Sequence, residues 1–267
     1  MTRKRASIGI LAGAVYFGLA SVSFADYQAG AVSGGGSISG VVTLKGNAPA
    51  PIMQDLKKEK NPEFCTKHPD ANKDGVRPIY KVQVKGGKLK DAVVYIENIA
   101  QGKAWPKEAI KYDFQDCDIV QRVGVVRPPG KEEKDNVVIV TNEDTDILHN
   151  PHGYNVKGAN RLTLFNKPLP SKGATADVTA TLKRFKEGKD EHFFLQCDQH
   201  NFMEADAKIV YNPYYAVSGA DGSFKIADVP AGKYKVTVWQ PYVGAASKEV
   251  TVAGGADAKT DFELAAK

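Results

Sequence analysis

Apolar and polar residues alternate along much of the chain in short runs, and glycines and prolines interrupt these runs at short intervals. Alternation with a period of two is typical of strands that bury one face, whereas no long segment has the 3.6-residue period of an amphipathic helix. The pattern predicts an all-β protein built from two β-sandwich domains. The expected strands cover residues 37–44, 79–84, 90–96, 112–114, 119–126, 136–141, 162–165, 176–182, 189–195, 207–211, 218–226 and 229–238.

The N-terminus has the pattern of a secretory signal peptide. Basic residues at 3–5 precede an apolar run over residues 8–19, and small residues follow at Ser23 and Ala25. This order is typical of a signal peptide covering residues 1–25. The alternative is a retained membrane anchor, but the apolar run is short for a membrane span. We therefore expect a periplasmic or secreted protein.

The charge balance argues against a nucleic-acid-binding protein. The chain of 267 residues has a formal charge of +5, and loss of the three cations at residues 3–5 with the signal peptide lowers it to +2. A chain so close to neutral has no basic patch of the kind that binds nucleic acid. No other apolar run approaches the length of a membrane span, so we expect no span in the mature chain.

A cluster of soft metal ligands lies in the second half of the chain. Cys197, His200 and Met203 offer a thiolate, an imidazole and a thioether within seven residues. These donors favour copper over magnesium or calcium, and one cysteine cannot hold an iron–sulfur cluster. A trigonal His₂Cys set with a weak axial Met is the arrangement of blue-copper electron-transfer sites. A second histidine has to come from elsewhere, and residues 146–152 supply two candidates.

This ligand pattern resembles that of the cupredoxins. An upstream His149-Asn150 pair is followed by Cys197-x-x-His200-x-x-Met203, and the short final spacing is similar to that of amicyanin. The resemblance implies a Greek-key sandwich that holds one type 1 copper as its cofactor. It further implies equatorial ligation by His149, Cys197 and His200, axial ligation by Met203, and hydrogen bonds from Asn150 that tie the two ligand loops together and orient the ligands.

His149 and His152 are alternatives for the upstream ligand. On a strand the two side chains would face opposite sides, but Pro151 and Gly153 allow a turn that could bring both to the copper. The cupredoxin pattern places the ligand directly before an asparagine, which favours His149.

The resemblance implies an exported protein that shuttles single electrons between redox partners. In cupredoxins the downstream histidine reaches the surface through an apolar patch, so a redox partner protein would dock near His200 and Phe202. The alternative for Phe202 is a core position under the metal site. The chain carries no Ser/His/Asp set, paired carboxylates or phosphate loop, so we expect no enzyme activity. Copper storage or delivery, and a structural or binding β-sandwich with an incidental metal site, are the alternative functions.

Cys65 and Cys117 are expected to form a disulfide. The chain has three cysteines, and an odd number in an exported protein leaves one unpaired. If Cys197 binds the metal, the other two remain for a disulfide, which would contribute roughly 4 kcal/mol in the chain-entropy model. The alternative is two unrelated buried thiols.

The C-terminal third resembles the transthyretin-like carboxypeptidase regulatory module. Residues 218–226 and 229–238 carry this resemblance, with Asp-Gly and Pro-Ala-Gly turns next to alternating strands. The opening of that module is similar to residues 37–44 followed by 92–96. We therefore expect an inserted domain, with three consecutive small β units as the alternative. The expected organisation is a signal peptide at 1–25, a flexible lead-in at 26–36, a transthyretin-like sandwich at 37–104 plus 212–267, and a cupredoxin domain at 105–211.

Overall fold

The computed structural model describes residues 27–97 and 99–266, and the regular secondary structure of these residues is almost entirely β-strand. The larger sheets pack in pairs across hydrophobic cores, which confirms the prediction of an all-β sandwich architecture. The signal peptide expected over residues 1–25 lies outside the described residues. Among the residues described, no helix is both long enough and apolar enough to cross a membrane.

One pair of sheets is built from the middle of the chain. Its four-stranded sheet has the order β10-β9-β12-β15, and its five-stranded sheet has the order β11-β17-β16-β13-β14. The first sheet consists of β9 (Ile110–Gln115), β10 (Asp118–Ile119), β12 (Val138–Asn142) and β15 (Thr175–Asp177). The second consists of β11 (Val123–Val126), β13 (Pro151–Lys157), β14 (Asn160–Asn166), β16 (His192–Cys197) and β17 (Glu204–Ile209). Apolar side chains of both sheets, including Tyr112, Val140 and Phe193, fill the core between them.

The other pair of sheets joins the two ends of the chain. One sheet has the order β18-β7-β20-β21, and the other has the order β19-β2-β6-β5, with β22 and β23 also paired to β2. The first consists of β7 (Val93–Glu97), β18 (Tyr215–Val217), β20 (Gly232–Gln240) and β21 (Gly244–Val252). The second consists of β2 (Gly36–Lys45), β5 (Val84–Lys85), β6 (Lys88–Leu89), β19 (Ser223–Val229), β22 (Asp257–Lys259) and β23 (Phe262–Ala265). Ile38, Val94, Val238 and Phe262 are among the buried residues of its core.

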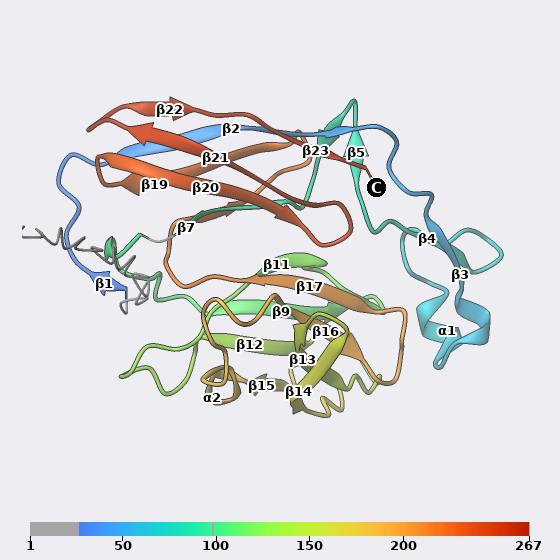
Figure 1. The fold of residues 1–267 in the computed structure, drawn as a ribbon. Helices are drawn as coiled ribbons and strands as arrows, with labels where there is room; N and C mark the ends of the chain where they lie inside the picture. Colours follow the sequence, from blue (N-terminus) through green and yellow to red (C-terminus); the bar gives the residue numbers. More distant parts are fainter. Residues whose placement is uncertain (1–26, 98, 267) are drawn as a thin grey trace, which may run out of the picture.

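The chain leaves this second pair of sheets after β7 and returns to it at β18. Everything from β9 to β17 lies in the first pair of sheets, as the lower half of Figure 1 shows. The two pairs contact each other through apolar residues such as Val93, Val125 and Val210. The Tyr242 hydroxyl also donates a hydrogen bond of 2.8 Å to Asp206 on β17. Side chains of both units therefore form a shared interface.

A small projection at residues 52–79, which we call the cap, lies beside one end of the lower sandwich (Figure 1). It consists of β3 (Ile52–Asp55), a 3₁₀ turn η1 (Leu56–Lys58), the short helix α1 (Pro62–Cys65) and β4 (Val76–Ile79). β3 and β4 pair antiparallel with each other alone. Buried Leu56 and Cys65 of the cap pack against Cys117 and Ile147 of the sandwich. These elements are too short for a hydrophobic period, which is why the sequence pattern predicts no strand between residues 44 and 79.

Three expected strands differ from the observed ones. In two of them the chain passes from one sheet to another, and the third ends early. Residues 119–126 are divided between β10 and β11, and residues 79–84 between β4 and β5. Residues 176–182 end as a strand at Asp177, where the chain turns into the helix α2 (Thr179–Leu182). The Asp177 carboxylate accepts a hydrogen bond of 2.9 Å from the Thr179 N–H, which favours the turn over a continued strand.

Two segments expected to be irregular are ordered. The segment around Pro151 and Gly153, where the sequence allows a turn, is instead the strand β13, which is paired on both sides. Gly153 fits there because a Cβ atom would lie 2.3 Å from the Phe165 ring that covers it. The lead-in expected to be flexible begins with β1 (Gln28–Ala29), which pairs in parallel with β8 (Gln101–Gly102). Tyr27 anchors it through ring contacts and a 2.6 Å hydrogen bond to a backbone carbonyl.

Candidate metal centre

A tight loop between β16 and β17 carries three of the expected ligands. Cys197 ends β16, and its N–H donates to the Met203 carbonyl at 3.1 Å. Inside the loop the His200 N–H donates to the Cys197 carbonyl, and the Met203 N–H donates to the His200 carbonyl at 2.9 Å. These bonds fold the loop back on itself. All three side chains are fully buried, and Cys197 and Met203 share the core of the sandwich.

His149 comes to the same place from the segment before β13, the strand that pairs with β16 in the same sheet. Its backbone forms an isolated bridge with Leu169, just before β13 begins. Its Nδ1 lies 3.7 Å from the Cys197 sulfur, and the Nδ1 of His200 lies at the same distance of 3.7 Å. The structure therefore brings His149, Cys197 and His200 together as a buried group that could hold a metal ion.

The spacing within this group fits a metal ion between the three atoms. Metal–nitrogen bonds of about 2.0 Å and metal–sulfur bonds of about 2.3 Å, as zinc makes, separate sulfur and nitrogen by about 3.7 Å when the angle is near 120°. The observed separations of 3.7 Å match that value. One thiolate and two imidazoles are also the donors that a trigonal copper site uses. The donor set and its spacing thus fit copper.

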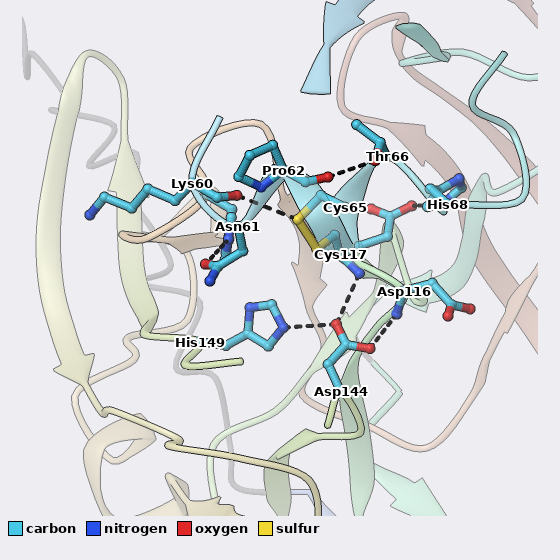
Figure 2. The surroundings of a disulfide bond; sticks show 12 residues. Lys60, Asn61, Pro62, Cys65, Thr66, His68, Asp116, Cys117, Asp144 and His149 are labelled. Atoms are coloured by element: carbon cyan, nitrogen blue, oxygen red, sulfur yellow. Dashed lines mark hydrogen bonds and ion pairs between the residues drawn. A yellow bond between two sulfur atoms is a disulfide. The ribbon is translucent and has the colours of Figure 1, made fainter. Parts of the chain in front are cut away.

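Asp144 fixes the orientation of His149. Its carboxylate lies 2.9 Å from His149 Nε2 and accepts hydrogen bonds from the backbone N–H groups of Asp116 at 2.6 Å and Cys117 at 2.9 Å (Figure 2). Burial opposes the charge, but these hydrogen bonds hold the pKa of Asp144 below its usual range. The Asp144 carboxylate accepts a hydrogen bond from the Nε2–H group of His149. The proton therefore stays on Nε2, and the lone pair of Nδ1 faces the Cys197 sulfur.

Asn61 of the cap contacts Nε2 of His200, just as Asp144 contacts Nε2 of His149. Its side-chain oxygen lies 3.2 Å from His200 Nε2. The backbone of Asn61 has φ 53°, a left-handed conformation that asparagine tolerates better than most residues. Sequence reasoning missed both Asn61 and Asp144. Asn61 lies 139 residues before its partner His200. Asp144 lies near His149 in the chain, but it belongs to no motif that marks it as a partner of this histidine.

The surroundings of the Cys197 thiol lower its pKa and favour the thiolate. Burial opposes ionisation, but hydrogen bonds with His149, His200 and the Asn150 N–H together lower the pKa of Cys197 to about 6. Burial likewise opposes charge on His149, while Asp144 and Cys197 raise the pKa of this imidazole. Thiolates are the form in which cysteine binds metals.

The backbone of Asn150 connects the two ligand loops. Its N–H donates to the Cys197 sulfur at 3.4 Å, and its carbonyl accepts a hydrogen bond from the Asp198 N–H at 3.0 Å. His152 lies outside the metal-binding group. Its Nδ1 lies 3.1 Å from the Asp198 carboxylate and its Nε2 lies 2.9 Å from the Thr163 hydroxyl. The strand geometry of β13 turns His152 away from the Cys197 sulfur.

The surface expected around His200 differs from the observed one. His200 is fully buried, because the cap covers the edge of its ring that a cupredoxin would expose. Phe202 is half-buried and packs against both the sandwich core and the cluster formed by the cap. The exposure of His200 was therefore predicted wrongly, and the reason is the contact with the cap.

The disulfide between Cys65 and Cys117 is confirmed. It joins the cap helix α1 to the two-residue turn between β9 and β10, where both Asp116 and Cys117 have positive φ. Both cysteines are fully buried. Cys197 is the free cysteine of the described residues. A disulfide is compatible with an oxidising compartment.

Comparisons with known proteins give two partial similarities. A family described as polysaccharide lyase family 4, domain II, matches residues 205–260, a minor part of the chain. A solved structure of a methionine-to-alanine variant of amicyanin in its Cu(I) form is similar at 17% identity and a TM-score of 0.27. This similarity covers 38% of the present chain and 82% of the amicyanin chain. The search of curated proteins gives no match. Similarities of this extent assign neither a family nor an activity.

Proposed function

We propose that this chain is a type 1 copper protein that passes single electrons between redox partners. The observation that carries the proposal is the placement of one buried cysteine sulfur at 3.7 Å from each of two histidine Nδ1 atoms. Copper bound by such donors would supply one-electron chemistry between Cu(I) and Cu(II).

The residues of the site have distinct roles in this proposal. His149, Cys197 and His200 would hold the copper, and Met203 would be a fourth, weaker donor. Burial of all four side chains excludes water from the ligand set. A site whose ligands move little between oxidation states favours fast electron transfer, and here the ligands come from a β-sandwich with fixed strand register.

Hydrogen bonds outside the ligand set support the same role. The Asp144 carboxylate restrains His149, the Asn61 amide oxygen restrains His200, and the Asn150 N–H contacts the Cys197 sulfur. Each partner fixes one ligand in the orientation in which its donor atom faces the other two. A redox partner would approach on the side of Asn61, which contacts His200, and of the neighbouring Lys60–Gln199 hydrogen bond.

We infer a domain organisation in which one sandwich interrupts the other. The pairing of β2 with β19, β22 and β23 supports a single sandwich at residues 37–104 plus 212–267, with the copper-binding sandwich at 105–211 inserted. The transthyretin-like character of the outer sandwich is a prediction from the resemblance, as is export to the periplasm or medium. In this organisation the cap belongs to the outer sandwich and covers the site of the inner one.

Copper storage or delivery is a second candidate, and one observation favours it. The complete burial of His200 beneath the cap removes the exposed ligand edge through which an electron partner would make contact. A carrier that only holds copper needs no such edge. Rapid self-exchange of electrons would distinguish the two functions in favour of electron transfer.

The deciding experiment is spectroscopy of the copper-loaded protein. A type 1 site gives an intense visible band from its thiolate–copper bond and a narrow parallel hyperfine splitting in the EPR spectrum of Cu(II). The Cys197→Ser variant is the control, because it removes the thiolate and retains the fold. A protein that binds no copper, or binds it without the visible band, would refute the proposal.

A further inference from the structure

The disulfide lies directly against the metal-binding group. The sulfur atoms of Cys65 and Cys117 and a ring nitrogen of His200 all lie within 4.8 Å of one another. Both cysteines and His200 have no exposed surface. The covalent link between the cap and the sandwich is therefore made at the point where the cap covers a proposed ligand.

Each half of the disulfide is connected to one histidine. On the cap side, the Cys65 N–H donates to the Asn61 carbonyl at 2.9 Å, and the Asn61 side chain contacts His200 Nε2. On the sandwich side, the Cys117 N–H donates to the Asp144 carboxylate, which holds His149 (Figure 2). The two sides differ in one respect. Asp144 belongs to the sandwich itself, whereas Asn61 stays at His200 only while the cap is docked.

Residues 60–64, the part of the cap that covers His200, make few contacts of their own with the sandwich. Phe64 is half-buried, and the Lys60 ammonium donates to the Gln199 amide oxygen at 2.8 Å on the surface. The rest of the cap is held more firmly: Leu56 is buried, and the buried Arg77 donates to the Cys117 carbonyl at 3.3 Å and pairs with Asp118. Segments with few buried contacts open locally at a lower free energy than the core of a protein, so residues 60–64 depend most on the disulfide.

We propose that the Cys65–Cys117 disulfide is a latch that keeps the cap closed over His200, and that its reduction opens the metal site. This inference rests on the proposed function for its meaning, because an opened cap exposes a copper ligand to exchange and to partners. While the latch is closed, Asn61 covers His200 and the ligand set is sealed. When the latch is open, the cap undocks and the edge of His200 faces solvent.

The opening step is a thiol–disulfide exchange with a dithiol. One thiolate of the dithiol attacks a sulfur of the Cys65–Cys117 bond, forms a mixed disulfide and releases the other cysteine as a thiolate. The second thiol of the dithiol then breaks the mixed disulfide. The protein gains two electrons and two protons as two thiols, and the dithiol becomes a disulfide. Since both sulfurs are buried, the exchange requires a local fluctuation that exposes one of them to the dithiol, which makes the latch slow to open.

The first test uses the metal-free protein and measures His200 directly. The wild type and a Cys65→Ala/Cys117→Ala variant are treated with diethyl pyrocarbonate, and each modified histidine is located by peptide mapping. We expect His200 to react on the order of tenfold faster or more in the variant, because the cap opens more often. His192, on β16 beside Trp239, is the internal control and keeps its rate.

The second test keeps the native sequence. Hydrogen exchange of the wild type is followed with the disulfide intact and after reduction by a phosphine. Amides of residues 56–67 should exchange on the order of tenfold faster after reduction, while amides of β16 and β20 keep their protection. Lys67→Ala, an exposed substitution within the cap, should leave the exchange of the oxidised protein unchanged.

Two results would overturn the latch. Unchanged reactivity of His200 together with unchanged exchange of the cap would show that the cap stays docked without the disulfide. Loss of protection in β16 and β20 as well would show that the disulfide holds the whole fold together. Neither measurement requires copper, so a copper-loaded protein without a visible band would refute the proposed function and leave the result on the latch intact.

Discussion

The Asp144 carboxylate lies 2.9 Å from His149 Nε2, and both side chains are almost completely buried. An acid in this position makes the attached imidazole a stronger electron donor, because the partial negative charge favours positive charge on the ring. Asp144 is itself fixed by two backbone N–H groups of the β9–β10 turn, so it cannot swing away. The first prediction tests this pair.

Asp144→Asn should weaken copper binding by about 10–100-fold and raise the reduction potential of the bound copper. The amide has nearly the same shape, but it lacks the negative charge that stabilises Cu(II) over Cu(I). Copper titration and voltammetry measure the two effects. Asp116→Asn is the matched control, because the Asp116 side chain is exposed and only its backbone N–H contacts Asp144. Equal potentials in Asp144→Asn and wild type would contradict the role of the charge.

The Cys197 thiol of the metal-free protein should ionise at a lower pH than an ordinary cysteine thiol. Its pKa is lowered from 9.0 to about 6 by the hydrogen bonds around the sulfur. Because the pKa of Cys197 is lower in the folded state than in the unfolded chain, the thiolate stabilises the fold fully at pH values above the unfolded-state pKa of 9.0. This stabilisation is lost as pH falls through about 6. Copper affinity should fall over the same range, because a proton then competes for the sulfur.

Ultraviolet absorbance of the thiolate measures this titration. The difference between the wild type and Cys197→Ser should show one step near pH 6, since the other two cysteines are joined in a disulfide. A step near pH 9 would mean that the imidazoles do not stabilise the thiolate.

His149→Ala should alter the spectrum of the bound copper, and His152→Ala should not. His149 Nδ1 lies 3.7 Å from the Cys197 sulfur, so its loss should abolish or convert the type 1 spectrum. His152 is engaged with Asp198 and Thr163 on the outer side of β13, so its loss should leave the spectrum unchanged. Visible absorbance and EPR of both copper-loaded variants measure the difference. A normal spectrum in His149→Ala would move the ligand assignment to His152.

Phe202→Ser should destabilise the protein by about 2 kcal/mol, less than the 3–5 kcal/mol typical of removing a fully buried aromatic ring. The ring is half-buried and packs between the sandwich core and the cap cluster, and its centroid lies 6.0 Å from that of His200. Thermal unfolding monitored by circular dichroism measures the loss. Leu162→Ser, at an exposed position on β14, is the control and should have little effect. An unchanged melting temperature in Phe202→Ser would instead favour Phe202 as part of a docking surface.

The sequence predicted the features that depend on neighbouring residues. The spacing of Cys197, His200 and Met203 within one loop is a local property, and so is the alternation that marks β2, β16 and β20. The pairing of Cys65 with Cys117 followed from the count of cysteines, because only two remained.

Contacts over long separations could not be predicted in this way. Asn61 reaches His200 across 139 residues, and nothing near it in the chain marks it as a partner of a metal ligand. Pro151 and Gly153 allowed a turn, yet tertiary packing selected a strand. Gly153 is there because the Phe165 ring occupies the space of a side chain. Such preferences are set by neighbours in space, which a single sequence does not reveal.

The pairing of β2 has a consequence for the order in which the molecule is completed. Ser37 is paired with Asp257, and Val42 is paired with Phe262. During synthesis, β2 therefore cannot form these pairs until more than two hundred further residues have been added. Until then the apolar side chains of β2 lack their final neighbours, and exposed strand edges of this kind favour aggregation. The strands from β9 to β17 have no such delay, because they pair only among themselves. The metal-binding sandwich is therefore free to form first, and the sandwich that begins the chain closes last.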